Sequence, residues 1–139
     1  MQVLRIGGFT VINDTYNANP DSVLAALRTL GSMHTKGKRI AVLGDMFELG
    51  GHAEEGHRSV GLAAGKAGVE YLLTHGTHAR LIHDAAVVKF KAHYDQKNVL
   101  AEYLSELLSD GDVVLVKGSR GMKMEDVVTF LQERFQRGS

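Results

Sequence analysis

Apolar residues follow two different spacings along the chain, and the change of spacing predicts an alternation of strands and helices. Two short runs of β-type residues, 3–6 and 9–12, flank a pair of glycines, Gly7 and Gly8. Two such runs on either side of a glycine turn are typical of a β-hairpin. We therefore expect the chain to open with an antiparallel hairpin.

A helix is predicted directly after the hairpin. From Pro20 to Leu30 the apolar residues recur three and four positions apart, as they do on one face of a helix. Asn19 is a residue type that caps helix N-termini, and proline is favoured at the first helical position. Gly31 is expected to end this helix, because glycine is common just past a helix C-terminus.

The remaining elements continue the alternation. Strands are expected at 39–44, 69–73, 88–94 (an edge strand) and 112–118, and helices at 53–67, 78–86, 98–108 and 122–135. The run "RIAVLG" at 39–44 is continuously apolar, as strands buried on both faces require. Strands that alternate with helices predict an α/β layered fold with a mostly parallel sheet flanked by helices.

Composition narrows the class of protein. The 139 residues suit a single domain spanning 1–139. Lys plus Arg and Asp plus Glu both number 16, so the net charge gives no reason to expect nucleic acid or a membrane as partner. The chain has no cysteine, which excludes disulfides and cysteine metal sites and fits a cytoplasmic protein.

Three polar clusters follow predicted strands. We call them the first polar loop ("NDTYNANP", 13–20), the second polar loop ("GDMFELG", 44–50) and the third polar loop ("KGSRGMK", 117–123). Ligands of open α/β sheets gather at the carboxyl ends of the strands. We therefore expect the three loops to line one crevice.

The first polar loop carries groups that suit a nucleoside. Asp14 can accept hydrogen bonds from hydroxyl groups such as those of a ribose, Tyr16 offers a stacking face, and Asn17 suits a base edge. A helix start capped by local turn bonds is the alternative interpretation of the same residues.

The other two loops carry charge. Lys117, Ser119 and Arg120 stand beside glycines and a predicted helix N-terminus, which favours an anion such as a carboxylate or phosphate. The alternative is a solvated turn. Asp45 and Glu48 can hold an ammonium group or a metal, although Asp45 equally suits a turn cap.

Several enzyme motifs are missing from the sequence. Gly51 and Gly56 have P-loop spacing, but His57 and Arg58 replace the lysine and the hydroxyl residue that a P-loop needs. The seven histidines lack the helical pair with a neighbouring carboxylate that marks zinc hydrolases, so surface or packing roles are expected for them. No G-x-S-x-G nucleophile elbow is present.

Three segments together resemble the C-terminal domain of Mur ligases, from about Gly8 to Phe135. They are "INDTYNANPDSVLAAL", "RIAVLGDMFELGGHAEEGHRSVG" and "DVVLVKGSRGMKMEDVV". The motifs "YNANP" and "KGSRGM" are most similar to those of the type that adds D-alanyl-D-alanine. Asn13 and Val23 depart mildly from the family pattern, which often has Asp and Met there. The resemblance implies a Rossmann-like fold.

The resemblance also implies an activity. Ligases of this kind add D-alanyl-D-alanine to UDP-N-acetylmuramoyl-tripeptide in peptidoglycan precursor synthesis, with ATP and through an acyl phosphate. Family members hold the UDP-sugar on an N-terminal domain, and hold the P-loop and most Mg²⁺ ligands on a central domain. Neither domain is recognisable here. The chain alone is therefore expected to be inactive, with no catalytic residue, no metal site and no tightly bound cofactor of its own.

Roles for single residues follow from the resemblance. Asp14, Tyr16 and Asn17 would contact the ribose and adenine of ATP, and Asn19 and Pro20 would shape the loop and cap the helix. The residues on the dipeptide and phosphate side would be Lys117, Ser119, Arg120, Asp45 and Glu48. Two alternatives stay open: a domain of another Mur-type or folylpolyglutamate-type ligase, and a stand-alone module that binds nucleotides or anions.

Overall fold

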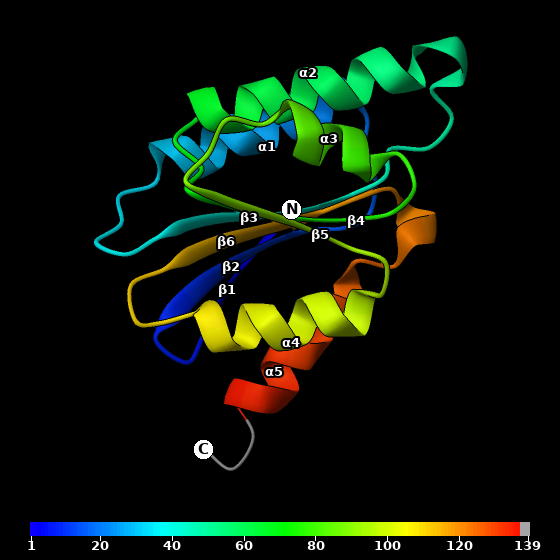
Figure 1. Cartoon of the computed structure of the whole chain (residues 1–139). Helices are drawn as coiled ribbons and strands as arrows, with labels where there is room; N and C mark the ends of the chain where they lie inside the picture. The colour runs from blue at the N-terminus through cyan, green and yellow to red at the C-terminus, as the bar shows by residue number, and fades with distance from the viewer. Residues whose placement is uncertain (137–139) are drawn as a thin grey trace.

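The computed structural model describes residues 1–136, and these form a sheet between two layers of helices (Figure 1). Its strands are β1 Gln2–Ile6, β2 Phe9–Asp14, β3 Arg39–Gly44, β4 Tyr71–His75, β5 Phe90–Tyr94 and β6 Val113–Lys117. They lie in the order β1-β2-β6-β3-β4-β5. The β1–β2 pair is antiparallel, and the other pairs are parallel. The predicted hairpin and the mostly parallel sheet are confirmed.

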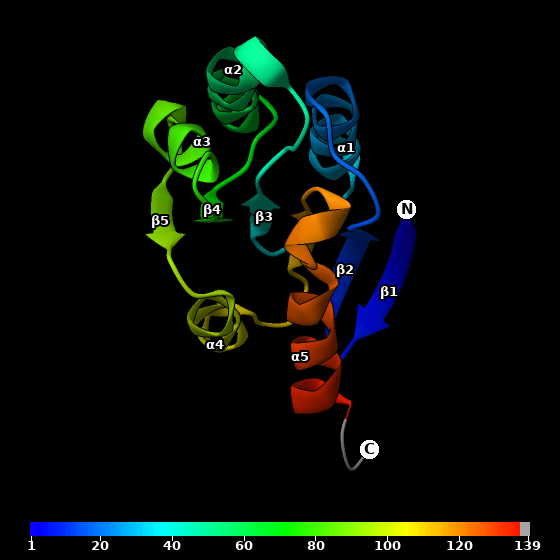
Figure 2. The same ribbon diagram turned by 90° about the vertical axis from the view of Figure 1, so that its right-hand side faces the viewer.

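The helices cover both faces of this sheet. They are α1 Pro20–Ser32, α2 Ala53–Lys66, α3 Ala79–Ala85, α4 Lys97–Leu107 and α5 Glu125–Phe135, with short 3₁₀ helices η1 Gly50–His52 and η2 Arg120–Met122. Helices α1, α2 and α3 lie on one face, and α4 and α5 on the other (Figures 1 and 2). None of the helices within residues 1–136 is long and apolar enough to cross a membrane.

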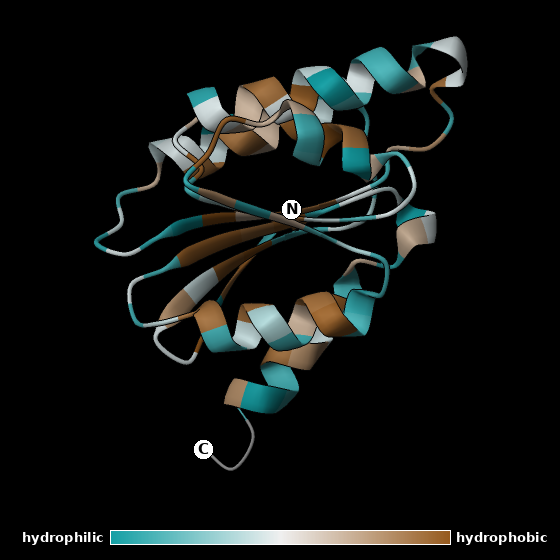
Figure 3. Ribbon diagram, in the orientation of Figure 1, coloured by the Kyte–Doolittle hydropathy of each residue, from teal (hydrophilic) through white to brown (hydrophobic). Residues whose placement is uncertain are grey.

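Two apolar cores result, one on each face. Along β3, Ala41 and Leu43 belong to the core under α1–α3, whereas Ile40 and Val42 belong to the core over α4 and α5. Alternate residues of a strand point to opposite faces, so a strand covered on both sides must be apolar at every position. Figure 3 shows hydrophobic colouring along the strands and hydrophilic residues on the outer faces of the helices.

Two predicted boundaries are wrong in instructive ways. Strand β4 runs over Tyr71–His75, although the pattern predicted 69–73. The last helix begins at Glu125, although 122–135 was predicted. Arg120–Met122 instead form η2, and Lys123 has a left-handed φ of 52°, which breaks the helical path. The chain therefore turns sharply between the third polar loop and α5.

The sequence predicted that Gly31 ends α1, but the helix continues to Ser32. Its role is a close approach between two helices. A Cβ atom built at Gly31 lies 2.4 Å from the carbonyl oxygen of Ala67, at the end of α2. A backbone oxygen at that distance cannot move aside as a flexible side chain can. The missing side chain therefore allows α1 and α2 to lie against each other.

Replacing Gly31 by alanine should lower the free energy of unfolding, although helix propensity alone would raise it. Propensity alone favours alanine inside a helix by about 1 kcal/mol, whereas overpacking costs roughly 1–3 kcal/mol. Chemical denaturation measures the sign. Gly51→Ala is the control, because no atom lies within 4 Å of its Cβ position and it should change stability little. A more stable Gly31→Ala variant would show that the helices separate freely.

Candidate functional site

The three polar loops meet at one end of the sheet, as the sequence predicts. They follow β2, β6 and β3, which are neighbours in the sheet order. Asp14 and Lys117 are direct partners across β2 and β6, and Leu43 is the partner of Lys117 on the other side. The connection after β6 leads to α5 on one face, and those after β2 and β3 lead to the opposite face. Such a divergence is where α/β sheets open a crevice.

The first polar loop begins the helix in the way its sequence predicts. Asn19 Oδ1 accepts a hydrogen bond from the Ser22 N–H at 2.9 Å, and Ser22 Oγ accepts one from the Asn19 N–H at 3.0 Å. This reciprocal pair forms a capping box, and Pro20 is the first residue of α1. Asn19 and Pro20 thus fix where the loop ends.

Lys117 is buried and already paired. Its side chain is 2% exposed, and its Nζ lies 2.9 Å from Asp14 Oδ2. The same ammonium group donates to the backbone oxygen of Asn17 at 2.8 Å. A lysine held this way fixes the first polar loop against β6. The contact with an anion that the sequence predicts for Lys117 stays a prediction. Asp14, with 20% of its side chain exposed, can still accept a hydrogen bond from a hydroxyl group.

Ser119 is the second buried link from β6. Its hydroxyl group accepts from the Phe47 N–H at 2.7 Å and lies 3.3 Å from the Ala18 oxygen, to which it donates. Its own N–H donates to the Asp45 oxygen at 2.9 Å. The hydroxyl proton is thus donated within the protein, and the contact with a ligand carboxylate that was predicted for Ser119 stays a prediction. Ser119 joins all three loops.

Arg120 and Tyr16 form an exposed flat surface beside these links. The guanidinium carbon of Arg120 lies 5.1 Å from the centre of the Tyr16 ring, within range for a cation–π contact. Tyr16 is 73% exposed, which leaves its ring open to a stacking partner. Asn17 is exposed as well, and its side-chain oxygen accepts from the Ala18 N–H at 2.9 Å.

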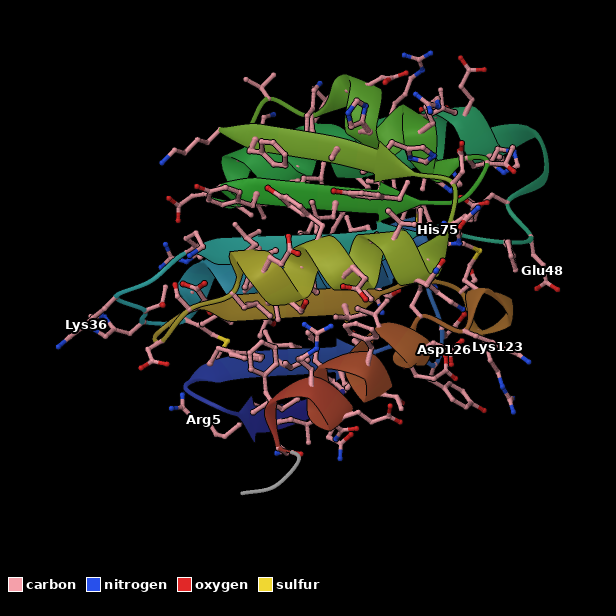
Figure 4. All side chains as sticks on the ribbon, turned by 60° about the horizontal axis from the view of Figure 1, so that its bottom comes forward. Arg5, Lys36, Glu48, His75, Lys123 and Asp126 are labelled. Carbon is pink, nitrogen blue, oxygen red and sulfur yellow. The ribbon has the colours of Figure 1, made fainter. Side chains whose placement is uncertain are left out.

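A cavity of about 640 Å³ opens at the carboxyl ends of β3, β4 and β5. Its lining combines acidic, basic and apolar side chains: Asp45, Phe47, His75, Gly76, Thr77, Arg80, His93, Asp95 and Met122. Among the site residues predicted from sequence, Asp45 alone lines it. Glu48 is exposed with a left-handed φ of 62° and points away from the sheet (Figure 4). The predicted pairing of Asp45 with Glu48 at one pocket is therefore not seen.

The other residues that line the cavity were not predicted from the sequence. Arg80 belongs to α3 after β4, and Asp95 follows β5 directly. The position rule that selected the three polar loops applies equally to these two strands. The signal was therefore present, but "HGTHAR" and "YDQ" lack the glycine and asparagine clusters that mark the other loops.

Asp45 is buried at the wall of this cavity and fixes the start of α3. Its Oδ1 accepts from the Ala79 N–H at 2.7 Å, and its Oδ2 lies 3.8 Å from His78 Nδ1. The carboxylate therefore places Arg80, the next residue along α3, at the same cavity. The sequence analysis also considered Asp45 as a turn cap. Asp45 does accept a backbone N–H at the start of a helix, but this helix, α3, follows β4.

His57 is a packing histidine, as the sequence analysis expected. It is fully buried and stacks on His78 with ring centres 5.3 Å apart. Its Nε2 accepts from the Met46 N–H at 2.9 Å, and its Nδ1 donates to the Ala53 oxygen at 2.6 Å. Burial lowers the pKa of His57, against smaller raising effects from the Ala53 carbonyl and the Asp45 charge. The neutral ring is the form that fits both hydrogen bonds.

Comparison with known proteins matches the family described as "Mur ligase, glutamate ligase domain" to residues 1–120. A UDP-N-acetylmuramoyl-tripeptide–D-alanyl-D-alanine ligase of Bacillus subtilis is 38% identical over 130 residues, which cover 91% of this chain and 28% of that protein. The Escherichia coli enzyme of the same name is 41% identical over 125 residues, covering 88% of this chain and 27% of that protein.

The fold comparison agrees. A crystal structure of a MurF ligase from Thermotoga maritima in complex with ADP superposes with a TM-score of 0.85 and 26% identity. The match covers 99% of this chain and 31% of that chain. The present chain thus spans between a quarter and a third of the length of these relatives.

The lowered pKa of His57 predicts acid sensitivity. A depressed folded-state pKa contributes stability above the ordinary value of 6.5, and that stability is lost as pH falls through the folded-state pKa. Urea denaturation at about pH 7.5 and about pH 5.5 should show a larger loss in the wild type than in His57→Gln. Equal losses in both proteins would mean that His57 does not carry the acid sensitivity.

Proposed function

Because the chain belongs to the Mur ligase family, we propose that it is the C-terminal domain of an ATP-dependent ligase that adds D-alanyl-D-alanine to UDP-N-acetylmuramoyl-tripeptide. Its identity to two ligases of that name, 38% and 41%, supports this substrate pair over other Mur-type reactions. In this proposal the UDP-sugar, the P-loop and the phosphoryl transfer belong to other domains of the same ligase. The reaction would take place in the cytoplasm, where ATP is supplied.

The surface around Tyr16 supports a role in binding ATP. The exposed ring can stack on adenine, Asp14 can accept a ribose hydroxyl, and the Asn17 amide can meet a base edge. Arg120 covers the ring from the third polar loop, so it lies where the nucleotide would meet the rest of the site. These residues fit the adenosine part of ATP, whereas no P-loop is present in the sequence.

We propose that the magnesium ion of the reaction is held mainly outside this chain. Within residues 1–136 no group of three or more His, Asp or Glu side chains is placed to hold a metal. Divalent magnesium needs oxygen ligands from carboxylates and phosphates. In our proposal, therefore, the ion is held by the triphosphate and the other domains.

The cavity supports a role in binding the dipeptide. Its volume of about 640 Å³ lies inside the range of small-ligand pockets, roughly 300–1,000 Å³. D-Alanyl-D-alanine is a zwitterion with two methyl groups, and the lining offers an acid at Asp45, a guanidinium at Arg80 and apolar walls at Phe47 and Met122. A guanidinium binds a carboxylate through two parallel hydrogen bonds.

This arrangement changes which arginine we assign to the dipeptide. The sequence favoured Arg120 as the carboxylate ligand, but its guanidinium lies over Tyr16. The adjacent Gly121 approaches Phe47 closely, because a Cβ atom at Gly121 would lie 2.8 Å from the Phe47 ring. Phe47, which lines the cavity, thus stands next to the Arg120 turn. We therefore assign Arg80 to the dipeptide carboxylate and Arg120 to the nucleotide side.

The chain's part in the reaction is to bind and orient. Holding the dipeptide carboxylate at Arg80 leaves its amino group at the opposite end. There the neutral amine can attack the acyl phosphate carried by the other domains, forming the amide and releasing phosphate. Positioning of two reactants lowers the barrier without any covalent role for this chain. The side chains of the cavity would also exclude water, which otherwise hydrolyses an acyl phosphate.

Kinetics of the complete ligase separate the two arginines. Arg80→Ala should raise the KM for D-alanyl-D-alanine about tenfold or more, because a hydrogen bond to a charged group contributes about 1.5–3 kcal/mol. Arg80→Lys should keep part of the affinity. Arg120→Ala should raise the KM for ATP and leave the dipeptide KM nearly unchanged.

The opposite pattern, a dipeptide defect in Arg120→Ala and none in Arg80→Ala, would return the carboxylate to Arg120. A wild-type ligase that binds ATP but shows no preference for D-alanyl-D-alanine over L-alanyl-L-alanine would overturn the proposed substrate.

A further inference from the structure

Lys97, the first residue of α4, makes three contacts with a single ammonium group. Its Nζ donates to the backbone oxygens of Met122 at 3.0 Å and Lys123 at 2.9 Å. It also forms an ion pair with Asp126 Oδ2 at 2.9 Å. An ammonium group has three protons, so these contacts use all of them. The side chain is 22% exposed, which limits competition from water.

The acceptors lie at a turn that needs support. Lys123 has a left-handed φ of 52°, which is uncommon for a residue with a side chain. Met122 ends η2, and the carbonyl groups at a helix end lack helical partners. Figure 4 shows Lys123 and Asp126 together at the same end of the molecule as His75. Lys97 thus satisfies the carbonyl groups of the turn between η2 and α5.

This turn belongs to both candidate sites. Met122 lines the cavity, and Arg120, two residues earlier, covers Tyr16. On the other side of the contact, Asp95 lines the cavity two residues before Lys97. The Lys97 side chain therefore connects two parts of the cavity lining, Asp95 after β5 and Met122 after β6. A second ion pair between α4 and α5, from Arg134 Nη2 to Glu102 Oε2 at 3.4 Å, lies near the other end of α5 and away from the turn.

We propose that Lys97 is a positioning residue for the dipeptide, which sets the separation of the Asp95 and Met122 walls of the cavity. The inference rests on the proposed function, because it assumes that the cavity holds D-alanyl-D-alanine. Lys97 itself does not line the cavity, so it acts through the two walls.

Lys38 is a matched control for Lys97, because its contacts are similar and it lies far from the cavity. Its side chain is 24% exposed, its Nζ lies 2.9 Å from Asp112 Oδ2, and it donates to Ser109 Oγ at 2.9 Å. It precedes β3, whereas the cavity lies where β3 ends. Figure 4 shows the neighbouring Lys36 at the end of the molecule opposite His75. Loss of Lys38 should therefore cost stability without changing the cavity.

The experiment compares Lys97→Met, Lys97→Arg and Lys38→Met in the complete ligase. For Lys97→Met we expect kcat/KM for D-alanyl-D-alanine to fall about 10- to 100-fold, because small misplacements of bound reactants have effects of that size. The KM for ATP should change less. Lys97→Arg should recover part of the loss, and Lys38→Met should lower the melting temperature while leaving dipeptide kinetics unchanged.

A milder variant keeps the test valid if Lys97→Met does not fold. Asp126→Asn removes one of the three contacts at an exposed carboxylate and should lower the dipeptide kcat/KM in the same direction by a smaller factor. Equal dipeptide kinetics in Lys97→Met, Lys38→Met and the wild type would overturn the role of Lys97. Absence of any dipeptide-dependent turnover in the wild type would instead overturn the proposed function.

Discussion

The end of β6 is the constraint on which the candidate site depends. Two buried polar side chains, Lys117 at the last position of this strand and Ser119 two residues beyond it, bond to the loops of both neighbouring strands. Buried polar groups without partners are costly, so each bond also fixes where a loop must lie. The first and second polar loops do not lie beside each other in the sheet order, because β6 stands between their strands. Lys117 and Ser119 link them through β6, in addition to the apolar core that Ala18 and Met46 share under α1–α3.

This arrangement serves geometry more than stability. Removing one partner of a buried ion pair is expensive, but the intact pair offsets the cost of burying two charges only in part. The Asp14–Lys117 pair is therefore weak evidence for a stabilising role and better evidence for a defined loop position. The exposed surface at Tyr16 and the cavity at Asp45 lie on either side of this braced region. A fixed spacing between two binding surfaces is what orients two bound reactants.

Much of this was predictable from the sequence, for local reasons. The capping box at Asn19 and the apolar run of β3 follow from short-range rules, and the meeting of the three loops follows from the parallel sheet. What could not be predicted was the direction of single side chains. Lys117 and Ser119 were predicted as ligand contacts because their residue types bind anions, and the structure shows that both side chains are buried and bonded within the protein. Arg80 was overlooked because its segment lacks the clustered glycine and asparagine residues of the other loops, although it too follows a parallel strand.

Hydrogen exchange of the backbone amides in Ser119→Ala tests the central claim most directly. If Ser119 links the loops, the Phe47 amide should exchange faster, and amide resonances should shift in both the first and the second polar loop. Residues 36–38 and 109–112, at the opposite end of the sheet, should be unaffected. Changes confined to the third polar loop would contradict the account, because the loops would then hold their positions without β6.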